Sequence, residues 1–135
     1  TVSVIDTKSS PPRVVNTVTV GQTPEGIKMS PDGKLVAVNV MNGSNKPKTS
    51  PFFKEGGLVQ VYQVSGNTLS KIGEVPVGKW CQGLAWSKNS KTVLAQCMVE
   101  EEIHVIKIAG FTSKGVTKAG VIKVQGGPAG IRTAE

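Results

Sequence analysis

The residues of this chain that could carry out chemistry are few and scattered. Its 135 residues include one histidine, His104, and two cysteines, Cys81 and Cys97. A structural zinc site needs four ligands, and the histidine falls on a different predicted strand from the cysteines. No Ser-His-Asp arrangement and no haem-attachment motif is present, so we expect neither a metal nor a cofactor. The sequence leaves open whether the protein is an enzyme.

The element that organises the chain is a β-hairpin centred on residues 30–34, Ser-Pro-Asp-Gly-Lys. Pro31 pre-sets the backbone for a type I turn, and Gly33 can adopt the positive φ that ends it. The apolar residues on both sides alternate with the period of strands. We predict two strands joined by a three-residue loop with a glycine bulge.

The hairpin belongs to a repeat. A glycine-bounded motif begins at Gly21, recurs 57 residues later at Gly78, and returns in shorter form at residues 126–130. A second apolar strand-like segment recurs in the same phase at residues 2–6, 59–63 and 103–107. Each repeat then holds four short antiparallel strands in about 40–50 residues, which is typical of a β-propeller blade. No segment has a sustained 3.6-residue apolar period, so the predicted class is all-β.

The first complete repeat resembles the YVTN type of β-propeller repeat. The resemblance rests on Val-Ser-Val-Ile-Asp-Thr at 2–7, Val-Thr-Val-Gly at 18–21, and the Pro-Glu-Gly and Ser-Pro-Asp-Gly-Lys motifs within 24–39. It is weaker in the second repeat, where Ser-Lys-Asn-Ser-Lys replaces the turn at 87–91. The resemblance implies a lactonase-like propeller of seven blades, a fold that supports many unrelated functions.

The phase of the repeats divides the chain into partial and complete blades. Residues 1–20 supply the last two strands of one blade, 21–77 and 78–125 form complete blades, and 126–135 supply the inner strand of a next or closing blade. About two and a half blades cannot close a ring, which needs at least four. We therefore expect the C-terminal portion of a longer propeller, whose remaining blades are the partners of this chain. A cleaved subunit or a self-assembling unit is the alternative.

The repeat also predicts how the two cysteines are placed. If the turn at 87–91 keeps the register of the turn at 30–34, Cys81 and Cys97 lie directly opposite each other as a hydrogen-bonded pair. Opposed Cβ atoms are about 4.5–5.5 Å apart, near the distance that a disulfide needs. A disulfide would indicate a periplasmic or secreted protein, whereas two buried thiols are the rule in the cytosol.

Propeller geometry selects the candidate site residues. The inner strands line the central channel, and the loops that enter them share one face, the top face, with the loops between the second and third strands. Glu25 and Gln82 occupy equivalent positions at the start of two inner strands, and Arg132 lies in the third. Trp80 lies in a top-face loop. Acids or histidines do not recur at these positions, which argues against a site built from matching residues.

Residues 41–57 form the largest departure from the repeat. Their Gly, Pro, Ser and Asn content excludes regular structure, and loops of this length are often functional. One interpretation is a partner-binding loop in which lysines meet an anionic group. The other is that the two phenylalanines pack over a neighbouring blade. The residues concerned are Phe52, Phe53, Lys46, Lys48 and Lys54.

The net charge of +7 comes from scattered lysines. There are only six aromatic residues and no basic run with aromatics between, so we expect a solvated surface and no nucleic-acid groove. No run of 18 apolar residues indicates a membrane span. We predict a non-catalytic binding or scaffold module that uses its top face for a ligand or protein partner. The alternative is a lactonase-like hydrolase whose site at the channel mouth requires residues from further blades.

Overall fold

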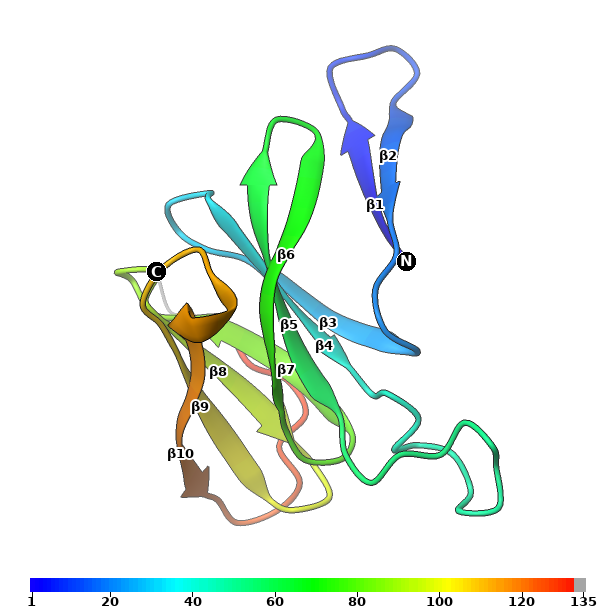
Figure 1. The fold of residues 1–135 in the computed structure, drawn as a ribbon, viewed down its shortest axis with the longest axis vertical. Helices are drawn as coiled ribbons and strands as arrows, with labels where there is room; N and C mark the ends of the chain where they lie inside the picture. Colours follow the sequence, from blue (N-terminus) through cyan, green and yellow to red (C-terminus); the bar gives the residue numbers. More distant parts are fainter. Residues whose placement is uncertain (133–135) are drawn as a thin grey trace.

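In the computed structural model, which describes residues 1–132, the chain forms three antiparallel sheets and no α-helix (Figure 1). The first sheet pairs β1 (Val2–Asp6) with β2 (Arg13–Val18). The second has the order β3-β4-β5-β6: Pro24–Met29, Leu35–Val40, Leu58–Ser65 and Thr68–Pro76. The third has the order β7-β8-β9-β10: Cys81–Trp86, Thr92–Cys97, Glu102–Ile108 and Val116–Lys123. A 3-10 turn, η1 (Ser113–Gly115), precedes β10.

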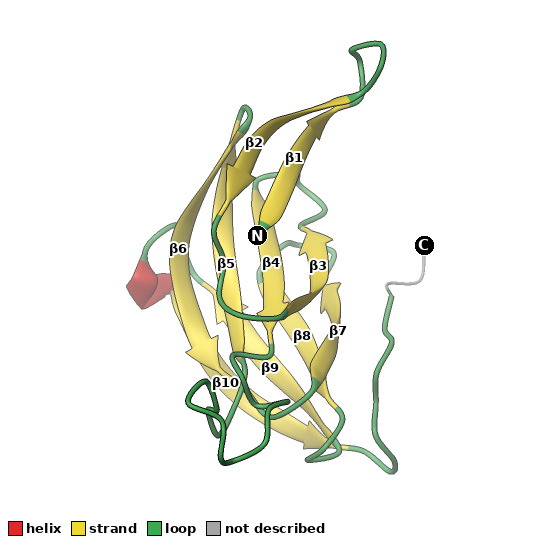
Figure 2. Cartoon of the chain, turned by 90° about the vertical axis from the view of Figure 1, so that its right-hand side faces the viewer, coloured by secondary structure: helices red, strands yellow, loops and turns green. Residues whose placement is uncertain are grey.

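The all-β class and the four antiparallel strands in each complete repeat are confirmed. Every strand pairs only with its neighbours in the sequence, and the described strands leave the sheets open (Figure 2). Residues 124–132 form no strand, although an inner strand was expected over 126–135; residues 133–135 lie outside the described part. This segment runs beside β7, where a Cβ added at Gly83 would lie 2.9 Å from the carbonyl oxygen of Ala129.

The hairpin turns are one residue longer than predicted. The amide of Ser30 donates to the carbonyl of Leu35 at 2.8 Å, which leaves four residues between them. Side chains close this wider loop: the Ser30 hydroxyl donates to Asp32 at 2.6 Å and accepts from the Leu35 amide at 2.9 Å. Gly33 adopts the expected positive φ, 71°. The hairpin at residues 87–92 repeats the arrangement.

The predicted pairing of the cysteines is confirmed, but the type of pair is not. A bulge on β7 after Cys81 shifts the register by one residue, and this shift cancels the extra residue in the turn. Cys81 therefore faces Cys97, and the two form a disulfide. The amide of Met98 donates to the carbonyl of Trp80, which makes the cysteines a non-hydrogen-bonded pair. Such pairs are the closer kind, and their Cα atoms are 3.9 Å apart.

The central strand β4 is buried on both faces. Leu35 and Ala37 belong to a cluster that also contains Val93 and Ala95 of β8, so this face packs against the third sheet. The other face carries Val36, Val38 and Val40, which pack with Val2 and Val18 of the first sheet. Full burial of each such side chain contributes about 1.5–3 kcal/mol. The three sheets are thus layered in the order of the chain.

The second and third sheets approach most closely where β3 meets β7. A Cβ added at Gly26 would collide with the carbonyl oxygen of Gln82, which lies nearer than any real Cβ contact allows. The side-chain amide of Asn39 donates to the carbonyl of Gly83 at 3.2 Å, and the indole of Trp86 donates to the carbonyl of Lys28 at 3.0 Å. These polar contacts fix the register of one sheet on the other.

Candidate functional site

The loops predicted to share a face lie at one end of the molecule. The amide of Met41 donates to the carbonyl of Thr23, which joins the loop before β3 to the loop after β4. The amide of Gly57 donates to the carbonyl of Gly78, and the amide of Lys79 donates to the carboxylate of Glu100 at 2.8 Å. We call this end of the molecule, where Thr23, Met41, Gly57, Gly78 and Glu100 lie, the loop face.

Residues 41–57 form a loop whose backbone is held by the rest of the structure. The side chain of Gln22 donates to the carbonyl of Phe52 at 2.9 Å, and that of Asn42 donates to Gly56 at 3.4 Å. Gly43 has φ 88°, and any Cβ there would collide with the Phe52 carbonyl. The backbone at the tip of the loop is therefore held by its contacts with Gln22 and with Gly43.

The aromatic pair in this loop is divided between surface and interior. Phe52 is 66% exposed, whereas Phe53 is half-buried. Within residues 1–132, Phe52 therefore does not pack over a neighbouring sheet. The same loop carries three lysines that are exposed and form no ion pair with another described residue: Lys46, Lys48 and Lys54.

Trp80 lies on the same loop face, next to the 41–57 loop. Its side chain is 42% exposed, and its φ of 52° is unusual for a bulky residue. The amine of Lys79 lies 3.7 Å from the carboxylate of Glu55, which ties the two loops together. The structure thus places an exposed aromatic residue in each of two adjoining loops.

The three residues expected at the channel mouth lie on separate segments. Glu25 is exposed on β3 and lines a pocket of about 260 Å³ with Thr1 and Ser3. Gln82 is half-buried on β7, with its backbone against Gly26. Arg132 is exposed near the end of the described chain and does not line the pocket of Glu25. Their segments adjoin at Gly26 and Gly83, but no hydrogen bond or ion pair joins these three described side chains.

The single histidine is the buried member of a polar network between β9 and β10. His104 is 3% exposed and lies 3.1 Å from the carboxylate of Glu102, which also pairs with Lys123 at 2.7 Å. Burial lowers the pKa of His104, and Lys118 adds to this effect. A hydrogen bond and the charge of Lys123 lower the pKa of Glu102. The network holds β9 to β10, and its histidine is buried, whereas Lys123 is exposed.

Within residues 1–132, no group of three or more His, Cys, Asp or Glu side chains is arranged to hold a metal ion. No helix in this range is long and apolar enough to cross a membrane.

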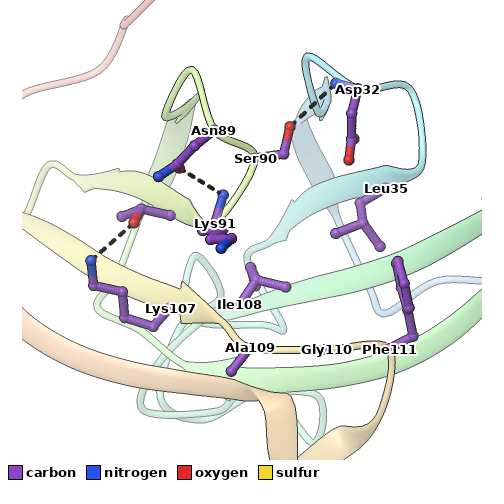
Figure 3. Close-up of a pocket in the computed structure, with 11 residues that line it drawn as sticks. Asp32, Leu35, Asn89, Ser90, Lys91, Lys107, Ile108, Ala109, Gly110 and Phe111 are labelled. Carbon is purple, nitrogen blue, oxygen red and sulfur yellow. Dashed lines mark hydrogen bonds between the residues drawn. The ribbon is translucent and has the colours of Figure 1, made fainter.

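A larger pocket, of about 640 Å³, lies at the end opposite the loop face (Figure 3). It lies between the two hairpin turns and the segment that follows β9, and it includes Ser90, Lys91 and Phe111. Sequence reasoning missed it because its walls come from two repeats. The one signal available was the change from Asp-Gly to Asn-Ser in the second turn.

The fold is similar to that of several solved structures. Two are bacterial proteins that carry the name "putative 6-phosphogluconolactonase", one from Bacteroides fragilis NCTC 9343 and one from Bacteroides uniformis ATCC 8492. They are 21% and 24% identical to this chain, each with a TM-score of 0.67 over 86% of it. The third is the hydrazine synthase of Kuenenia stuttgartiensis, at 12% identity and a TM-score of 0.57 over 90% of the chain.

These likenesses concern the fold alone. The chain spans about a third of the length of the two Bacteroides proteins, 31% and 32%, and 41% of the Kuenenia chain. No model of a known protein family matches the sequence, and no curated protein matches it.

Proposed function

We propose that this chain forms consecutive blades of a β-propeller. The support is the equivalence of the sheet faces. Leu94, Ile103 and Val105 lie on the outer face of the third sheet, at the repeat positions that Ala37, Val59 and Val61 occupy in the second. The second-sheet residues are fully buried against the third sheet, whereas the outer-face residues are only half-buried. A further blade would complete their burial, and such blades are the partners that this chain requires.

Within that propeller, the loop face binds a protein partner without catalysis. The observation that carries this proposal is Phe52, which is two-thirds exposed at the tip of a loop whose backbone is already fixed. Exposed aromatic anchors on preorganised backbone are the residues that dominate binding energies. The uncompensated charges of Lys46, Lys48 and Lys54 favour a partner whose apolar contact is flanked by acidic groups.

Selection from a random peptide library displayed on phage tests the proposal. We expect the protein to enrich peptides that combine Asp or Glu with an apolar residue. Truncation of a central aromatic side chain costs about 1.4 kcal/mol of binding free energy or more. Phe52→Ser should therefore weaken the binding of these peptides at least about tenfold.

The matched control is Phe111→Ser, because Phe111 is also an exposed phenylalanine, 49%, but lies at the opposite end. It should leave peptide affinity unchanged. Equal affinities for the wild type and Phe52→Ser, or the failure of the library to yield any acidic peptide, would refute a binding role of the loop face.

A second candidate is hydrolysis of a lactone, and the fold shared with the two Bacteroides proteins favours it. Its residues would be Glu25, Gln82 and Arg132 at the channel mouth, together with groups from further blades. Release of acid from 6-phosphogluconolactone, followed at constant pH, tests this candidate. Activity that Glu25→Gln abolishes would replace the binding proposal with a catalytic one.

We also propose that the protein works outside the cytoplasm, in the periplasm or as a secreted protein. The Cys81–Cys97 disulfide supports this, since disulfides persist in oxidising compartments.

A further inference from the structure

The pocket at the turn end of the molecule has the size and lining of a small-molecule site. Its volume of about 640 Å³ falls inside the range of roughly 300–1,000 Å³ for ligand pockets. Its floor is apolar, formed by Leu35 and Ile108, and Phe111 provides an apolar wall (Figure 3). Lys91 supplies a cationic group at the second hairpin, whereas the amine of Lys107 is bonded to Thr92 on the outer face of the third sheet.

The second hairpin keeps the geometry of the first but loses its negative charge. In the first, Asp32 accepts from the Ser30 hydroxyl at 2.6 Å and from the Lys34 amide at 3.1 Å. In the second, Asn89 accepts the equivalent bonds from Ser87 at 2.7 Å and from Lys91 at 3.1 Å. An amide can replace the carboxylate in this role because only one oxygen is used. The charge of Lys91 is therefore left without the acid that accompanies Lys34.

Asp32 also lines the pocket, but its carboxylate is engaged within its own hairpin. The hydrogen bond from Ser30 and that from the Lys34 amide lower the pKa of Asp32 and keep the group ionised. Towards the second hairpin, Asp32 presents its backbone amide, which donates to the hydroxyl of Ser90 at 3.2 Å (Figure 3).

Ser90 is the second residue of this hairpin that departs from the repeat, and it also lines the pocket. It stands where the first hairpin has Gly33 and adopts a similar positive φ, 58° against 71°. A serine is strained in this conformation whereas glycine is not, and such strain tends to occur at functional sites. The buried hydroxyl is used to join the two hairpins, which fixes the walls of the pocket relative to each other.

We propose that this pocket binds a small organic anion with an apolar body. The carboxylate of the ligand pairs with Lys91, and its apolar part lies against Ile108 and Phe111. The site is separate from the loop face and does not depend on the function proposed there.

Titration with 4-phenylbutyrate, followed by amide NMR of the protein, tests the inference. We expect saturable shifts at the amides of Ser90, Lys91 and Gly110. The neutral analogue 4-phenyl-1-butanol has the same apolar body without the charge, so it should bind about tenfold more weakly, the value of one charge-assisted contact.

Two variants complete the design. Lys91→Gln should weaken the binding of 4-phenylbutyrate about tenfold and leave the binding of the alcohol unchanged. Lys34→Gln is the matched control, since Lys34 is the equivalent lysine of the first hairpin and does not line the pocket. The amide spectrum of each variant reports whether the fold is intact. Absence of saturable shifts at these three amides, or equal weakening by both variants, would overturn the inference.

Discussion

Replacement of Gly26 by alanine tests the packing of the two large sheets. The new Cβ would collide with the carbonyl oxygen of Gln82, and both groups belong to backbone in paired strands. One sheet must therefore move by about an ångström or more relative to the other. Overpacking costs typically about 1–3 kcal/mol, and the upper end applies because no flexible side chain can yield.

We expect Gly26→Ala to lower the free energy of unfolding by about 3 kcal/mol, and Tm by about 10 °C. Urea unfolding at 25 °C, followed by tryptophan fluorescence, measures the change. Trp86 is a suitable reporter because its indole donates to the carbonyl of Lys28 across the same seam.

Gly120→Ala is the matched control. Gly120 is also a half-buried glycine at a bulge, without positive φ, but a Cβ there would meet no atom within 4 Å. Alanine should stabilise the protein by about 0.4–1 kcal/mol, because the unfolded chain loses conformational freedom. If the free energies of unfolding of the two variants differ by less than about 0.5 kcal/mol, the sheets do not approach as closely as described.

Two further predictions concern the disulfide and the histidine. Replacement of Cys81 and Cys97 by alanine opens a link between residues 16 apart and should lower the free energy of unfolding by about 3 kcal/mol. Wild-type protein unfolded in urea with reductant should match this variant, and a midpoint insensitive to reductant would contradict the prediction. The pKa of His104 lies below its unfolded value of 6.5 because burial and Lys118 outweigh Glu102. The unfolded chain therefore takes up the proton first as pH falls, and the stability that neutral His104 confers is lost below about pH 6.5. The urea midpoint should fall less between pH 7 and pH 5 in His104→Gln than in the wild type, and equal falls would refute the assignment.

The strands were predictable because their signals are local. Alternation around residues 30–34 and its recurrence 57 residues later were sufficient to place two complete four-stranded sheets. The turn length was predicted wrongly because the hydroxyl of Ser30 and the carboxylate of Asp32 hold a wider loop. The cysteines were paired correctly because the longer turn and the bulge after Cys81 cancel, and neither feature was anticipated.

The candidate sites depend on contacts between distant segments, and this limits what the sequence can predict. The backbone that carries the exposed Phe52 is held by Gln22, 30 residues earlier, and no local pattern encodes that contact. The turn-end pocket depends on the bond between Asp32 and Ser90, which are 58 residues apart. The residue types at both places were visible, but their relative positions follow only from the packing of the sheets.

The pairing of every strand with its immediate neighbours in the chain has a consequence for how the protein folds. Residues 24–76 contain all the strands that pair in the second sheet, and residues 81–123 contain all those of the third. Pairing between neighbours means that each of these sheets can form from one contiguous segment of the chain. During synthesis the second sheet can form before the third has been translated, and each new sheet then finds a finished surface on which to pack.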